Sequence, residues 1–174
     1  MRIAYADPPY PGMSSRYGRR EVRHDRLVAA LLRFDAWALS TSSSALREVL
    51  PLCPQGTRVL AWCKSWCSWK PGVWPHFTWE PVLLWPKRPA NYKQRSNPRD
   101  YHVGVAHQVG FFGSKPPDFC GWLFDCLGAT PDDEFHDLFH GSGAVKRAWD
   151  QWCASARAGG PLFIEERVDV KPTN

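Results

Sequence analysis

The sequence contains no run of about eighteen apolar residues, the length that a membrane-spanning helix requires. Its N-terminal residues lead directly into a proline-rich turn, without the apolar stretch of a secretion signal. The usual signs of a membrane or secreted protein are therefore missing. We expect no membrane association and a cytoplasmic location.

Two common nucleotide-binding loops are also missing. No Gly-Lys-Ser or Gly-Lys-Thr sequence is present, and the turn Gly141-Ser142-Gly143 lacks the third glycine of a dinucleotide fingerprint. ATP and NAD loops of the usual kinds are therefore disfavoured.

Cysteines are present, but not in a zinc-binding pattern. Several of the six cysteines lie inside apolar runs, where a reduced cysteine behaves as a small hydrophobic residue. Cys63 and Cys67, with Cys53 and His76 nearby in the sequence, would be the ligands of a metal site, but their spacing matches no standard zinc pattern. We expect packed thiols and no metal.

The chain has the size of one domain and many aromatic and proline residues. Its 174 residues can bury one sizeable core. Ten tryptophans and sixteen prolines indicate fixed turns and flat aromatic surfaces, which suit a planar ligand. Five tryptophans that either line a pocket or form core follow the third expected strand, namely Trp62, Trp66, Trp69, Trp74 and Trp79.

The net charge of +5 is concentrated in one segment, residues 86–99, which has no acidic residue. Its five basic residues are Lys87, Arg88, Lys93, Arg95 and Arg99. With Tyr92 among these charges, the segment predicts contact with the phosphates of a nucleic acid and strongly salt-dependent binding. A solvated basic loop is the alternative interpretation.

The hydrophobic pattern alternates between strands and helices. Strands are expected at Arg2–Ala6, Asp35–Thr41, Arg58–Cys63, Trp79–Trp85, Glu134–Phe139 and Leu162–Glu165. Helices are expected from Asp25 as N-cap to Arg33, from Ser43 or Ser44 to about Leu52, from Pro116 to Leu127 and from Ala144 to Ala156. Pro81 indicates an edge position or a bulge. The alternation predicts an α/β fold with a mostly parallel, doubly wound sheet covered on both faces.

Two tight turns follow strands and should lie at the carboxyl edge of this sheet, where such folds bind ligands. In His140–Gly143, the glycines let the backbone approach a ligand, although many α/β connections contain such a turn for conformational reasons alone. Glu165 and Glu166 follow about twenty residues later, where one carboxylate can accept both hydroxyls of a ribose. This spacing suits a nucleoside-containing cofactor such as S-adenosylmethionine (SAM). Two solvated acids are the alternative, and which of the two points inward stays open.

The other turn, Asp7-Pro8-Pro9-Tyr10, presents a carboxylate, a carbonyl and an aromatic ring on a rigid backbone. An exocyclic amino group of a nucleobase can donate to the Asp7 side chain and the Pro8 carbonyl while the base stacks on Tyr10. A Pro-Pro turn that simply ends a strand is the alternative.

Three motifs carry a resemblance to a known family. Asp7-Pro8-Pro9-Tyr10 resembles the catalytic motif of the SAM-dependent amino methyltransferases, which modify N6 of adenine or N4 of cytosine. Gly113–Pro116 before a helix is similar to their Lys-Pro element, and Asp137–Ala144 to their Asp-x-Phe-x-Gly-Ser-Gly cofactor loop. The order of the motifs resembles the permuted β-class arrangement, and also the adenine methyltransferases related to the eukaryotic mRNA enzyme.

The resemblance implies a Rossmann-like class I methyltransferase fold, SAM as cofactor, and a set of site residues. The implied catalytic residues are Asp7, Pro8, Pro9 and Tyr10. The implied cofactor-binding residues are Asp7, Lys115, Asp137, Phe139, Gly141, Ser142, Gly143 and either Glu165 or Glu166. Lys115 would pair with the carboxylate of the cofactor, or else is a solvated lysine at the start of a helix.

The resemblance also implies direct methyl transfer to an exocyclic nitrogen. The tyrosine form of the motif favours N6 of adenine, and the basic segment then indicates contact with the phosphates of a nucleic acid, for which we expect DNA before RNA. Four alternatives stay open: an RNA adenine methyltransferase, a cytosine N4 methyltransferase, a catalytically silent nucleic-acid-binding subunit and a small-molecule or nucleotide methyltransferase. The catalytically silent subunit is disfavoured, because a protein that only binds nucleic acid would not need the intact catalytic motif.

We expect one catalytic domain over residues 1–174, with inserts at about 13–24 and 64–110 and no separate target-recognition domain. Selectivity for a target would then come from these inserts or from a partner, either a second copy of the chain or another recognition protein, or else be slight.

Overall fold

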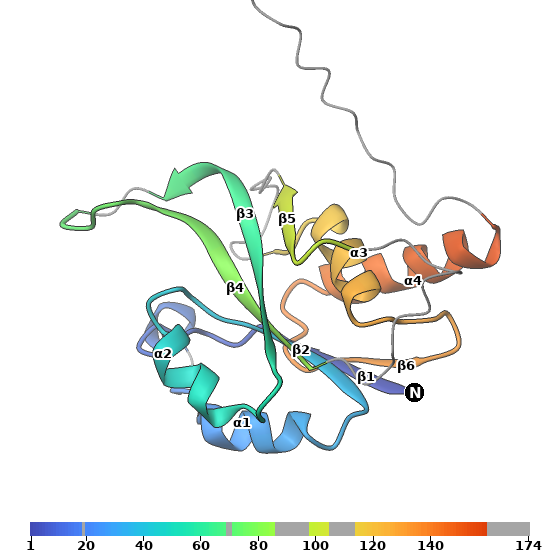
Figure 1. The fold of residues 1–174 in the computed structure, drawn as a ribbon, viewed down its shortest axis with the longest axis horizontal. Coiled ribbons are helices and arrows are strands. Elements are labelled where there is room, and N and C mark those ends of the chain that lie inside the picture. The colour runs from blue at the N-terminus through green and yellow to red at the C-terminus, as the bar shows by residue number, and fades with distance from the viewer. Residues whose placement is uncertain (19, 69–70, 86–97, 105–113, 160–174) are drawn as a thin grey trace, which may run out of the picture.

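A six-stranded sheet forms the centre of the molecule (Figure 1). The structure is a computed structural model, and it describes residues 1–18, 20–68, 71–85, 98–104 and 114–159. The strands are β1 (Arg2–Ala6), β2 (Ala36–Ser40), β3 (Arg58–Ser68), β4 (Phe77–Trp85), β5 (Tyr101–Gly104) and β6 (Glu134–Asp137). The helices are α1 (His24–Leu31), α2 (Leu46–Val49), α3 (Pro117–Cys126) and α4 (Ala144–Arg157), with short 3-10 helices at Ser14–Tyr17 and Leu50–Leu52.

The strand order is β5-β3-β4-β2-β1-β6. Strand β1 pairs in parallel with β2 and β6, and β3 pairs in parallel with β5. Only β4 runs in the opposite direction, since it is antiparallel to both of its neighbours, β2 and β3. The sheet is thus mostly parallel, which confirms the predicted fold class.

Helices cover both faces of the sheet. Along β1, Ile3 and Tyr5 belong to the apolar core under α3 and α4, whereas Ala4 and Ala6 belong to the core under α1 and α2. Because both faces of these strands are buried, their sequences are almost continuously apolar. Figure 1 shows the two helix pairs on opposite sides, so the sheet is doubly wound.

Strand β4 lies inside the sheet, but at Pro81 its ladder register continues with β3 alone, and the pairing with β3 becomes irregular nearby, between Cys63 and Ser68. The proline is tolerated because β2 pairs with β4 only as far as Ser40 opposite Val82. Beyond that point, residues 77–81 of β4 pair with β3 alone. Pro81 therefore marks the end of the pairing with β2, and its carbonyl accepts a hydrogen bond from the amide of Thr41.

Other boundaries also differ from the sequence-based expectation. Strand β5 was not expected, and β3 continues five residues beyond Cys63 to Ser68. Helix α1 begins at His24, and Asp25 does not cap it because its carboxylate pairs with Arg23. The strand expected at Leu162–Glu165 lies outside the described residues.

The helices in the described ranges include none that is both long enough and apolar enough to cross a membrane.

Candidate functional site

The site lies where β1 and β6 end side by side. Tyr5 is the register partner of Asp137, and the amide of Leu138 donates to the carbonyl of Tyr5 at 2.9 Å. The chain leaves β1 toward α1 on one face of the sheet and leaves β6 toward α4 on the other. This change of direction is the usual ligand-binding position of doubly wound sheets. It brings together the two turns that the sequence singled out.

Asp7 follows β1 and forms an ion pair with Lys115, the residue two positions before α3. The Nζ of Lys115 donates to the Oδ2 of Asp7 at 2.6 Å. The lysine side chain is only 6% exposed and that of Asp7 is 21% exposed, so the pair is largely removed from water. Pro8 and Pro9, the next two residues, are buried and hold the turn against the protein.

The electrostatics of this pair follow from its burial. Burial raises the pKa of Asp7 and outweighs the opposite effect of Lys115, and the negative charges of Glu80 and Asp137 raise it further. Burial lowers the pKa of Lys115, but Asp7 and Glu80 outweigh it, so that the pKa lies above its usual value. The lysine therefore stays charged and is the cation closest to Asp7 in the described site.

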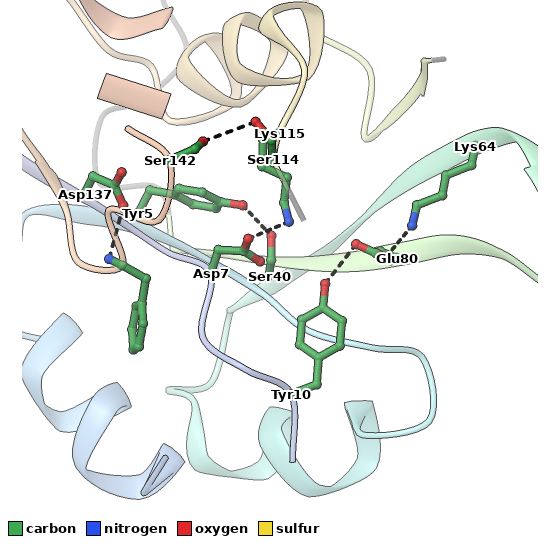
Figure 2. Close-up of polar contacts among 11 residues, drawn as sticks. Tyr5, Asp7, Tyr10, Ser40, Lys64, Glu80, Ser114, Lys115, Asp137 and Ser142 are labelled. Atoms are coloured by element: carbon green, nitrogen blue, oxygen red, sulfur yellow. Dashed lines mark hydrogen bonds and ion pairs between the residues drawn. The ribbon is translucent and has the colours of Figure 1, made fainter. Parts of the chain in front are cut away.

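Tyr10, the last residue of the turn, is anchored by Glu80 on β4 (Figure 2). Its hydroxyl donates to the Oε2 of Glu80 at 2.8 Å, and the Nζ of Lys64 on β3 donates to the other carboxylate oxygen. Burial, with the nearby charges of Asp7 and Glu80, raises the pKa of Tyr10 well above its usual value. Tyr10 is therefore a neutral phenol at physiological pH.

A buried tryptophan lies next to both lysines of the site. The Nζ of Lys64 is 4.9 Å and that of Lys115 is 5.5 Å from the ring centroid of Trp62. Both distances allow a cation–π interaction. Trp62 belongs to the core under α3 and α4, where its ring packs on Phe119. Of the five tryptophans that the sequence singled out, this one is core, while Trp74 is 86% exposed.

The second turn has the backbone that its glycines predict. Gly141 has φ of 45° and Gly143 has φ of 73°, both in the left-handed region that favours glycine. Gly143 is the N-cap of α4, and the Oγ of Ser142 lies 3.3 Å from the Oγ of Ser114. The turn thus presents backbone amides at a helix N-terminus, a position that favours polar or anionic groups.

Asp137, at the end of β6, has an unused acceptor. Its Oδ1 accepts a hydrogen bond from the amide of Phe139 at 3.1 Å. Its Oδ2 is buried and has no hydrogen-bond partner among the described residues. Burial raises the pKa of this carboxyl group, whose residue is 6% exposed. Because buried polar atoms are nearly always hydrogen-bonded, this oxygen is a candidate acceptor for a ligand that donates to it.

Several predicted site residues are not placed by the structure. Those outside the described residues are Lys87, Arg88, Tyr92, Lys93, Arg95, Glu165 and Glu166. Arg99 is described and exposed, and it precedes β5 at the far edge of the sheet, where its Nη1 donates to the hydroxyl of Tyr101. Among the described residues, no three His, Cys, Asp or Glu side chains are grouped so as to hold a metal ion.

Sequence reasoning missed Glu80 and Lys64. The signal for Glu80 was a lone acid within the otherwise uncharged segment Phe77–Trp85. It could be recognised as a site residue only with the strand order, because its neighbour Tyr10 is 70 residues away in sequence.

No protein-family model and no curated protein sequence matches this chain. Among solved structures, it is similar to the crystal structure of the M1.HpyAVI–SAM complex, with 15% sequence identity and a TM-score of 0.57 over 86% of this chain and 78% of that chain. It is also similar to the crystal structure of M1.HpyAVI, with 12% identity and a TM-score of 0.52 over 90% of this chain and 86% of that chain. The likeness shows that the chain shares the fold of these structures.

Proposed function

We propose that this protein is a SAM-dependent methyltransferase that acts on the N6 amino group of adenine in DNA. One observation carries the proposal: the Asp-Pro-Pro-Tyr turn after β1 and the glycine turn before α4 lie at the ends of neighbouring parallel strands. A group held by one turn would therefore lie next to a group held by the other. This is the arrangement that transfer between a cofactor and a base requires.

The residues of the glycine turn fit SAM. The Oδ2 of Asp137, which has no hydrogen-bond partner in the part of the chain that the structure describes, can accept a hydrogen bond from an ammonium or hydroxyl group. Among the described residues, a Cβ at Gly141 would meet only the carbonyl of Phe139, at 3.7 Å, so these residues leave space against this backbone. The similar M1.HpyAVI was crystallised in complex with SAM. When bound, SAM supplies a methyl group activated by its sulfonium.

We assign cofactor binding to the residues of this turn, and to two further positions as predictions. Those of the turn are Asp137, Phe139, Gly141, Ser142 and Gly143. Glu165 or Glu166 would bind the ribose. Lys115 donates to Asp7 in this structure. To pair with the carboxylate of the cofactor, its Nζ would have to contact Asp7 and that carboxylate together, or to leave Asp7.

The catalytic turn would activate and orient the base. The lone pair of an exocyclic nitrogen is delocalised into the ring, which makes the amine a poor nucleophile. Hydrogen bonds from the amine to the Asp7 carboxylate and the Pro8 carbonyl favour its tetrahedral form, in which the lone pair is localised. Tyr10 would replace the stacking that the base loses when it leaves a duplex. The charge of Lys115 helps to keep Asp7 ionised and able to accept these hydrogen bonds.

A nucleic-acid substrate is supported by charge. The five positive charges of residues 86–99 account for the whole net charge of +5, and no acid opposes them within the segment. Such a segment would neutralise phosphates and release counterions on binding.

One assay tests the proposed function. The purified protein is incubated with labelled SAM and with DNA, RNA or free nucleotides, and the digested products are identified by mass spectrometry. We expect N6-methyladenine in DNA, lost in Asp7→Ala and retained in Asp150→Ala, which removes an exposed carboxylate on α4. Methylcytosine would overturn the base assignment, and label only in RNA or nucleotides would overturn DNA as substrate. Label in none of them would overturn the proposed activity.

A further inference from the structure

Glu80 links the catalytic turn to the middle of the sheet. Its Oε2 accepts the hydroxyl of Tyr10 at 2.8 Å, and its Oε1 accepts the Nζ of Lys64. Figure 2 shows the side chain of Glu80 between those of Tyr10 and Lys64, which come from opposite sides. The side chain of Glu80 is 21% exposed, so solvent screens these contacts only in part.

The strand order places Glu80 at this edge of the sheet. Strand β4 runs against β2 and β3, and its pairing with β2 starts only at Val82. Glu80 lies two residues before Val82, just past the carboxyl end of β2, and pairs with Trp62 of β3. The antiparallel strand thereby brings an acidic side chain to the edge where the turn after β1 also lies.

The charges of the neighbours set the direction of the Tyr10–Glu80 hydrogen bond. Burial raises the pKa of Glu80, but Lys115 and Lys64 outweigh it, so that the net pKa is below its usual value. Tyr10 is a neutral phenol because its pKa is raised. An ionised carboxylate thus accepts from a neutral hydroxyl, which is the stronger, charge-assisted type of hydrogen bond.

We propose that Glu80 is a positioning residue that holds the ring of Tyr10 in the orientation in which it receives the base. This inference rests on the proposed function of the catalytic turn. A tyrosine side chain has two rotatable bonds, and an anchor at the far end of the ring limits the first, which sets where the ring lies. Without the hydrogen bond to Glu80, only a fraction of the protein molecules hold the Tyr10 ring in the orientation that receives the base. The apparent affinity for the substrate is then reduced in proportion to that fraction. A base that has docked restores the orientation, so turnover of the bound complex changes little.

This role of Glu80 predicts that losing the hydrogen bond to Tyr10 changes KM for the DNA substrate much more than kcat. Tyr10→Phe keeps the ring and removes its hydroxyl, whereas Glu80→Ala keeps the hydroxyl and removes its acceptor. We expect each variant to raise KM for an adenine-containing DNA oligonucleotide about tenfold, to change kcat less than about twofold, and to leave the affinity for SAM unchanged. Glu80→Gln retains an acceptor oxygen and should recover most of the loss.

The double variant tests whether the two residues act as one unit. If Glu80 acts through Tyr10, combining Tyr10→Phe with Glu80→Ala raises KM no more than either change alone. The matched control is Glu134→Ala, which removes a strand carboxylate that pairs with Arg2 and His136 at the start of β6. We expect this control to leave KM and kcat as in the wild type.

The outcomes separate this inference from the proposed function. A wild-type protein that methylates no substrate would overturn both. An active wild type in which the two losses multiply to about a hundredfold, or in which KM of the single variants is unchanged, would overturn the role of Glu80 alone. A loss of SAM binding in Glu80→Ala and Glu80→Gln would assign Glu80 a structural role instead, and would also overturn it.

Discussion

The Nζ of Lys115 lies 2.6 Å from the Oδ2 of Asp7, although 108 residues of sequence separate the two. The contact joins the segment before α3 to the turn after β1. A lysine this deeply buried needs an anionic partner, because an uncompensated buried charge strongly destabilises a protein. The proposed catalytic carboxylate is thus also the partner that allows Lys115 to be buried.

Replacing Lys115 should change the pH dependence of methyl transfer. Asp7 must be ionised to accept hydrogen bonds from the amine, and Lys115 lowers the pKa of this carboxyl group. In Lys115→Met the pKa of Asp7 rises further, because burial and the charges of Glu80 and Asp137 remain. The acidic limb of the kcat/KM profile should therefore move to higher pH.

The control is Lys146→Met, which removes an exposed lysine on α4. An acidic limb that stays in place in Lys115→Met would show that ionisation of Asp7 does not limit the reaction.

Asp137→Asn should weaken SAM binding without destabilising the free protein. The variant keeps an oxygen for the amide of Phe139 but removes the charged acceptor, which we expect to lower SAM affinity at least about tenfold by calorimetric titration.

Asp137→Asn should preserve or increase the stability of the free protein, although it weakens SAM binding. Because folding raises the pKa of Asp137, its ionised form costs stability at neutral pH, and the cost disappears as pH falls below the pKa of the unfolded chain. Urea unfolding should therefore show Asp137→Asn to be at least as stable as the wild type at pH 7, with the difference shrinking in acid. A less stable variant with unchanged SAM affinity would contradict both expectations.

Gly143→Ala should affect both stability and cofactor binding. At φ of 73°, a side chain strains the backbone, and the new Cβ would lie 3.1 Å from the Nη1 of Arg147. We expect a loss of about 1–2 kcal/mol of unfolding free energy and measurably weaker SAM binding.

Gly159→Ala is the matched control, because Gly159 has φ of 70° at the other end of α4 and no atom of residues 1–159 that the structure describes lies within 4 Å of the added Cβ. It should lose similar stability, as measured by urea unfolding, but keep its SAM affinity. Equal SAM affinity in both variants would argue against cofactor binding at the glycine turn.

The basic segment should determine the salt dependence of DNA binding. Replacing Lys87, Arg88, Lys93 and Arg95 together by Ala should reduce the slope of log affinity against log salt by up to about 4. The control removes the same charge from four exposed positions elsewhere, namely Arg26, Arg33, Arg47 and Lys146. Fluorescence titration at several salt concentrations measures both slopes, and equal slopes would show that the segment makes no special contact with phosphates.

Local patterns predicted most of the fold. Strand β1 and helices α3 and α4 were expected within about two residues of their observed limits, because their apolar periodicity and their turn residues agree. Strand β5 was missed because Tyr101–Gly104 is short and exposed at the edge of the sheet, where no apolar run distinguishes it. Pro81 indicated an edge position or a bulge but not which neighbour the strand would lack there, because the length of β2 is a property of the sheet and not of the residues around the proline.

The sequence by itself determined the two turns of the site, because their geometry is local. Two consecutive prolines restrict the backbone after Asp7, and glycines permit the left-handed conformations before α4, whatever surrounds them. Only the tertiary structure decided which side chains meet these turns. Lys115 and Glu80 reach Asp7 and Tyr10 through the order and register of strands distant in sequence, and the low polarity of the buried site makes those charges matter.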